Sequence, residues 1–109
     1  MHIDTLVIDQ IYTRALDHTF SFTANSAGNY LFVAGNVTAA DNYSMPITPS
    51  SNMTTIFENS DVLLSISYSL KVATATLETG ETASIRVENS KTGSDAANRK
   101  FAFTMIFKY

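Results

Sequence analysis

Alternation of apolar and polar residues, with a period of two, runs through most of the chain and limits it to folds built from β-strands. Between Thr82 and Glu88, for example, Ala83, Ile85 and Val87 alternate with polar residues. Successive side chains of a strand point to opposite faces, so this spacing places one face in a core and the other in water. The sequence therefore predicts an all-β protein.

The same alternation predicts four further strands. The residues that share one face are Phe20 and Phe22 in 18–24, Tyr30, Phe32 and Ala34 in 30–38 (opposite Leu31, Val33 and Val37), Val62, Leu64, Ile66, Tyr68 and Leu70 in 62–71, and Phe101, Phe103, Met105, Phe107 and Tyr109 in 101–109. We expect Ile66 and Phe103 to be buried. Phe103→Ala should therefore lower the free energy of unfolding by about 3–5 kcal/mol. The last segment has a thin polar face, which predicts a strand covered on both sides.

Turn-forming residues separate these segments. Turns are expected at Asn25–Asn29, where Gly28 can adopt positive φ, at Glu58–Asp61, at Glu78–Glu81 and across 90–98. The stretch 39–51 contains both prolines and predicts an irregular surface loop, followed by a short strand at 53–57.

The N-terminal segment, residues 1–17, fits either a strand or an amphipathic helix. Its run from Thr5 to Ile8 is rich in β-branched residues, which favours a strand. Seven or eight short strands with regular turns are typical of an antiparallel β-sandwich. We therefore expect one domain over residues 1–109, with a strand or arm at 1–17 and the main body at 18–109.

Charge and cysteine content exclude several kinds of partner and site. The formal net charge is −3 and the basic residues are scattered, which argues against nucleic-acid binding. The chain has no Cys, so it can form neither a disulfide nor a thiolate site.

The longest apolar run, Tyr30 to Gly35, is far shorter than the roughly 20 residues that span a bilayer. The start, Met1 to Asp4, lacks the basic and apolar regions of a signal peptide.

The order of these features resembles one family. The relevant segments are Phe20-Ser21-Phe22-Thr23, the turn at Gly28, Tyr30-Leu31-Phe32-Val33, the stretch Gly80 to Val87, and the aromatic strand Phe101 to Tyr109. Together they resemble the trimeric jelly roll of complement globular heads and tumour-necrosis-factor-like domains, a fold found also in bacteriophage fibres and decoration proteins. The resemblance implies a small antiparallel β-sandwich of jelly-roll type and a homotrimer.

No pattern in the sequence indicates catalysis or a metal site. His2 and His18 have no second His or carboxylate at ligand spacing, and no Gly-x-Ser-x-Gly motif occurs. Glu58, Asn59 and Asp61 offer oxygen ligands for calcium, but fewer than a dedicated loop provides. We expect no catalytic residue, no metal, no cofactor and no enzymatic activity.

Two interaction sites are predicted instead. The first is a subunit interface on the last strand, formed by Phe101, Phe103, Met105, Ile106, Phe107 and Tyr109. Ile106 is expected to be exposed there, on the face opposite the aromatic residues. The second is a ligand loop at Asn42 and Tyr43, where an aromatic ring beside an amide suits a sugar. Alternatively, Tyr43 packs this loop onto the sandwich.

These features lead to one function and one alternative. The first is a non-enzymatic virion structural protein, such as a homotrimeric phage capsid decoration, head-fibre or tail-appendage protein. Its partners would be further copies of itself and other virion proteins or a host surface glycan. A virion location fits the lack of a signal peptide, because phage proteins leave the cell by lysis. The alternative is a carbohydrate- or receptor-binding module.

Overall fold

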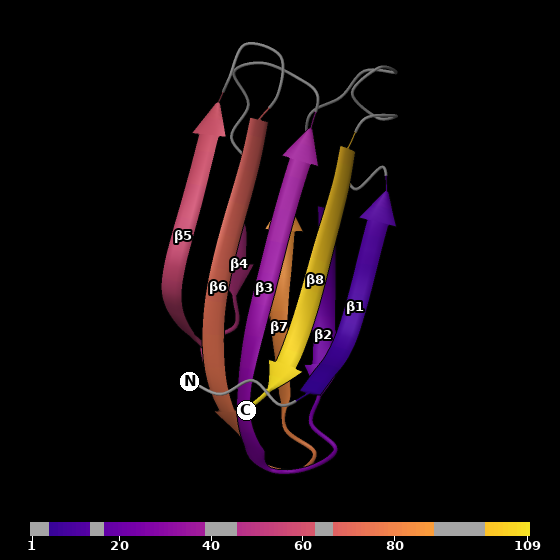
Figure 1. The fold of residues 1–109 in the computed structure, drawn as a ribbon, viewed down its shortest axis with the longest axis vertical. Helices are drawn as coiled ribbons and strands as arrows, with labels where there is room; N and C mark the ends of the chain where they lie inside the picture. The colour runs from indigo at the N-terminus through magenta and orange to yellow at the C-terminus, as the bar shows by residue number, and fades with distance from the viewer. Residues whose placement is uncertain (1–4, 14–16, 39–45, 63–66, 89–99) are drawn as a thin grey trace.

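The computed structural model describes residues 5–13, 17–38, 46–62, 67–88 and 100–109. Their strands form two antiparallel sheets that pack face to face as a β-sandwich (Figure 1). The five-stranded sheet has the order β1 (Thr5–Thr13), β8 (Lys100–Lys108), β3 (Gly28–Thr38), β6 (Ser67–Leu77) and β5 (Thr54–Val62); the three-stranded sheet has the order β2 (Asp17–Thr23), β7 (Thr82–Glu88) and β4 (Ile47–Pro49). The predicted all-β sandwich is confirmed, and the N-terminal segment contributes a strand.

The strand pairing is that of a jelly roll with one change. A jelly roll is a long antiparallel hairpin rolled into two sheets, so that early strands pair with late ones. Here β1 pairs with β8, β2 with β7 and β3 with β6. The change is at β5, which pairs with β6 rather than with β4. One sheet is therefore wider than the other, and β4 forms an edge.

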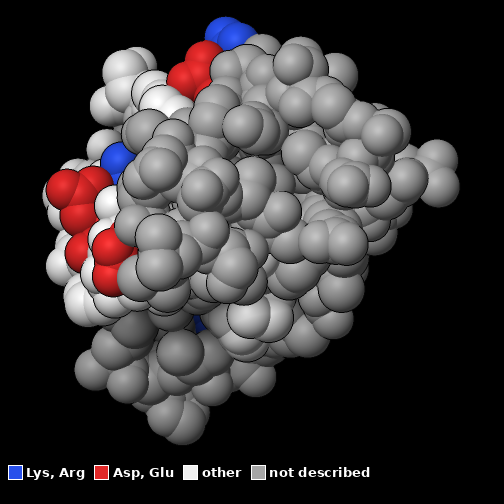
Figure 2. Space-filling view, turned by 90° about the horizontal axis from the view of Figure 1, so that it is seen from above, with Lys and Arg blue, Asp and Glu red and all other residues white. Residues whose placement is uncertain are grey.

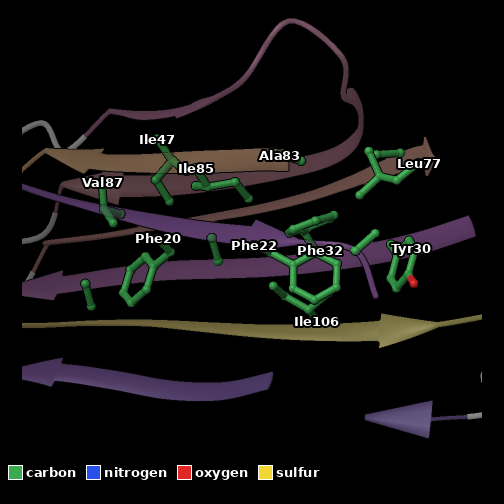
Figure 3. Packing of buried hydrophobic residues seen from close by; sticks show 14 residues of the cluster. Phe20, Phe22, Tyr30, Phe32, Ile47, Leu77, Ala83, Ile85, Val87 and Ile106 are labelled. Carbon is green, nitrogen blue, oxygen red and sulfur yellow. The ribbon is translucent and has the colours of Figure 1, made fainter. Parts of the chain in front are cut away.

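The core lies between the two sheets and is lined by the inner faces of β2, β3 and β7 (Figure 3). The ring of Phe22 on β2 lies 5.0 Å from that of Tyr30 and 6.0 Å from that of Phe32, both on β3. Ile85 and Val87 on β7 are fully buried with them. The alternation predicted for these three strands is confirmed. On β3, whose two faces are both apolar, Tyr30 and Phe32 belong to the core cluster and Leu31 and Val33 lie on the opposite face.

The prediction of which face of β8 lies in the core is wrong. Ala102, Thr104 and Ile106 face the core, and Ile106 is only 2% exposed. The larger side chains, such as Phe103 and Met105, lie on the outer face of the sheet and are partly exposed. Both faces of this strand are apolar, so alternation alone could not assign the inner one. The rings of β2 and β3 already occupy the core beside β8, and mostly smaller residues fit against them.

The predicted strand over 62–71 is also wrong in its bounds. Val62 ends β5, Ser67 begins β6, and residues 63–66, with Leu64 and Ile66, lie outside the described residues. Tyr68 and Leu70, expected to face inward, are partly exposed, while the inner face of β6 carries Ala73, Ala75 and Leu77. The turn expected at 58–61 is part of β5, an edge strand whose exposure suits polar residues.

Two turn assignments changed as well. Gly28 is the first residue of β3 and does not have positive φ, whereas Gly80 has φ 87° in the predicted turn at 78–81. Within the predicted loop 39–51, residues 47–49 form β4. Pro49 is tolerated there because an edge strand does not need every amide hydrogen.

The turn at Gly80 is held by the Glu81 carboxylate, which leads to a prediction of pH dependence. Hydrogen bonds from the Glu78 amide (3.0 Å) and the Asn52 side chain (3.2 Å) lower the pKa of Glu81 below its ordinary value of 4.5. A carboxyl group whose pKa is lowered on folding stabilises the protein above its ordinary pKa and loses this effect as the pH falls through the folded value. Glu81→Gln should therefore lower the thermal midpoint at pH 7. This difference from the wild type should shrink below about pH 4.5 in melts followed by circular dichroism. A difference that is constant from pH 7 to pH 2 would contradict the prediction.

Candidate association surface and pocket

The outer face of the five-stranded sheet carries a continuous set of apolar side chains on its three central strands. We call this set the outer apolar face; it consists of Leu31, Val33, Val37, Leu70, Val72, Phe103, Met105 and Phe107. Val33 lies at its centre, paired with Met105 of β8 on one side and Val72 of β6 on the other. None of its members is charged. Such a face is unusual on the surface of a monomer.

The apolar character continues onto the edge strand β5. Phe57 pairs with Val72 and is 52% exposed, and Ile56 is 53% exposed at the irregularity between Thr55 and Phe57. An irregularity of this kind twists an edge and discourages pairing with a further strand. These two side chains are therefore better placed for contacts through the sheet face than along its edge.

Gly35 allows Phe103 to lie against the sheet. A Cβ atom added to Gly35 would overlap Cε1 and Cζ of the Phe103 ring on the neighbouring strand β8. Glycine in a strand often marks such a close approach. Phe103 is thus partly buried against the backbone of β3 and exposes the rest of its ring on the outer apolar face.

This packing predicts a strong coupling between the two residues. Gly35→Val should destabilise the protein by about 1–3 kcal/mol, because the new side chain must displace the ring. With Phe103→Ala as background, the same change should cost much less, since the space is then empty. Chemical denaturation of the four proteins in a double-mutant cycle measures the difference. Additive effects of the two changes would show that the ring does not lie over Gly35.

The structure separates the residues predicted for the subunit interface. Four of them are partly exposed: Phe103, Met105 and Phe107 on the outer apolar face, and Tyr109. Ile106, in contrast, is buried in the core, so the prediction that it is exposed is wrong. The side chain of Phe101 is not among those described, and the ligand-loop residues Asn42 and Tyr43 lie outside the described residues, as does His2.

The residues considered for metal binding have structural contacts instead. Glu58 lies on β5 and forms an ion pair with Lys71, with 3.2 Å between Oε2 and Nζ. His18 packs edge-on against Phe20, with 4.5 Å between the ring centroids. In the described ranges no three His, Cys, Asp or Glu residues are grouped as metal ligands would be. The same ranges contain no helix long and apolar enough to cross a membrane.

A pocket between β4, β5 and β6 was not predicted. We call it the β4–β6 pocket; it has a volume of about 370 Å³ and is lined by Pro46, Ile47, Glu58, Asn59, Ser60, Ser69, Leu70 and Lys71. It exists because β5 pairs with β6, which carries the inner faces of both strands beyond the short edge strand β4. Nothing in the sequence pattern indicates this pairing, so the pocket could not be found from alternation.

Opposite charges occur side by side on the described surface. Besides Lys71 and Glu58, Arg86 and Glu88 pair on β7, with 3.2 Å between Nη2 and Oε1. In the view from above, the acidic side chains gather along one side of the molecule, with basic ones beside them (Figure 2). The described charges therefore form no extended field of one sign on this face.

Comparison with known proteins adds no relative to this picture. No protein-family model matches the sequence, and neither the curated proteins nor the solved structures include a significant match. The outer apolar face and the β4–β6 pocket therefore stand as candidate sites on the residues and geometry of this chain alone.

Proposed function

We propose that this protein is a non-enzymatic structural protein of a virion and that it assembles as a homotrimer through the outer apolar face. The observation that carries the proposal is this face itself, a set of apolar side chains that are partly exposed, apart from the buried Leu31, with no charge among them. Burial of such side chains in a subunit interface removes apolar surface from water, which is the main driving force of association.

The size of the sheet supports a second copy as the occupant. The three strands that carry the outer apolar face, about 4.8 Å apart and each with about four outward residues spaced about 6.8 Å, cover roughly 400 Å². This is about half of the roughly 800 Å² that each partner buries in a standard protein–protein interface, so the face would form the apolar centre of a larger contact. Copies of one chain offer each other the same uncharged apolar side chains at this centre.

The trimer and the virion location rest on the resemblance and on composition. The pairing of β1 with β8, β2 with β7 and β3 with β6 agrees with the jelly roll that the resemblance implies. The chain combines a low charged fraction of 16% with no Cys, as suits a surface coated with Ser, Thr and Asn. A capsid decoration, head-fibre or tail-appendage protein has this character.

The mass of the protein in solution tests the assembly. Light scattering at micromolar concentration should give three chain masses of 11.9 kDa each. A monomer that persists at high concentration would refute association, and a stable dimer would refute the trimer. The virion role has a separate test in the neighbouring genes, which should encode capsid, portal or tail proteins.

A further inference from the structure

The β4–β6 pocket is a polar site on a face of the sandwich that the smaller sheet does not cover. Residues of β5 and β6 alternate between faces, so Glu58 and Ser60 share the inner face with Ser69 and Lys71, to which they are paired in register. These four residues all line the pocket. The inner faces of β2, β3 and β7, by contrast, are mostly apolar and buried.

The two charged groups of the pocket neutralise each other. Lys71 donates a hydrogen bond to the Ile47 carbonyl at 2.7 Å and lies 3.2 Å from Glu58 Oε2. These contacts hold the ammonium group, whose side chain is 19% exposed, while the Glu58 side chain is 68% exposed. A charged ligand would have to break this pair, so the pocket favours a neutral ligand over an anion or a cation.

The remaining hydrogen-bonding capacity of the pocket suits hydroxyl groups. An ammonium group has three donors and a carboxylate has two acceptor oxygens, so Lys71 and Glu58 each retain capacity beyond their contacts. Among the residues that the structure describes, the hydroxyls of Ser60 and Ser69 have no hydrogen-bond partner. A donor next to an acceptor matches two adjacent hydroxyls of a sugar, one of which accepts while the other donates.

The pocket is better suited to a small molecule than to an added strand. The Ile47 carbonyl is already bonded to Lys71, and Pro49 has no amide hydrogen, so β4 offers little backbone for a further strand. A volume of about 370 Å³ lies at the lower end of the range for small-molecule sites.

We propose that the β4–β6 pocket binds a neutral saccharide, with Lys71, Glu58, Ser60 and Ser69 as its hydrogen-bonding groups. The binding site would lie on the inner side of β5 and β6, opposite the outer apolar face, so that a trimer could bind sugar and remain assembled. Recognition of a small neutral ligand by a few hydrogen bonds in an open site predicts weak binding per subunit. A trimer would strengthen it by presenting several copies.

Titration followed by NMR tests this proposal on the ¹⁵N-labelled full chain. The probes are glucose, galactose, mannose, N-acetylglucosamine and lactose at millimolar concentrations, with sodium sulfate and acetate as anionic probes. At least one sugar should cause saturable shifts at the amides of Glu58, Ser60, Ser69 and Lys71. The double variant Ser60→Ala/Ser69→Ala should bind at least about tenfold more weakly, since two hydrogen bonds are lost.

The matched control is Thr54→Ala/Thr74→Ala, which removes two hydroxyls from the outer face of the same two strands. This control should bind sugar like the wild type. Several results would overturn the proposal: no saturable shift with any sugar, equal affinity of the serine double variant, or stronger shifts with the anions. Loss of binding in Tyr43→Ala alone would place the site in the 39–51 segment instead. Light scattering of the serine double variant keeps the trimer a separate question, because Ser60 and Ser69 lie on the inner face of the sheet, away from the outer apolar face.

Discussion

Phe32→Ala is expected to reduce the free energy of unfolding by about 3–5 kcal/mol. Phe32 lies on the central strand β3, is 2% exposed and packs against Phe22 of the opposite sheet. Its removal leaves a cavity between the sheets that rigid strands cannot close. Since a domain of this size is stable by roughly 5–15 kcal/mol, the loss is a large share of the total.

Urea denaturation followed by circular dichroism measures this loss, and Phe103→Ala is the matched control. Phe103 is also a phenylalanine in the five-stranded sheet, but its ring lies on the outer apolar face and is partly exposed. The 3–5 kcal/mol expected from the sequence for Phe103 therefore applies to Phe32. Phe103→Ala should lower the free energy of unfolding clearly less at dilutions where the chain is monomeric, since assembly would cover its ring. Equal losses for the two variants would mean that the outer face is as well covered as the core.

Val33→Lys is expected to convert the trimer into monomers. Val33 lies at the centre of the outer apolar face between Val72 and Met105, so in the assembly a lysine there would lose its water without an acidic neighbour in register. An unpaired charge in an interface costs several kcal/mol, and each 1.4 kcal/mol weakens association tenfold. The light-scattering mass should fall from three chain masses to one at micromolar concentration.

The control for this variant is Thr19→Lys, which adds the same charge to an exposed position of β2 in the other sheet. It should leave the trimer intact. Both variants should keep the circular dichroism spectrum and cooperative unfolding of the wild type, because both positions lie outside the core. A trimer that persists in Val33→Lys would show that subunits meet through another surface.

Alternation determined most of the strands and, where one face was polar, their orientation. Ala83, Ile85 and Val87 were correctly assigned to the core because the residues between them, such as Arg86, cannot be buried without a partner. The same reasoning held for Phe20 and Phe22. In these strands the cost of burying polar groups leaves a single arrangement, so sequence alone is sufficient.

The tertiary structure decided two points that alternation leaves open. These are which face of β8 lies in the core and which strand β5 pairs with. Both faces of β8 are apolar, so the space beside Phe22 and Phe32 selected Ile106 for the core and left Phe103 and Met105 outside. The pairing of β5 with β6 depends on contacts between strands rather than on the pattern within either one. The outer apolar face and the β4–β6 pocket both follow from these two choices, because each is formed by residues that become neighbours only when the sheets assemble.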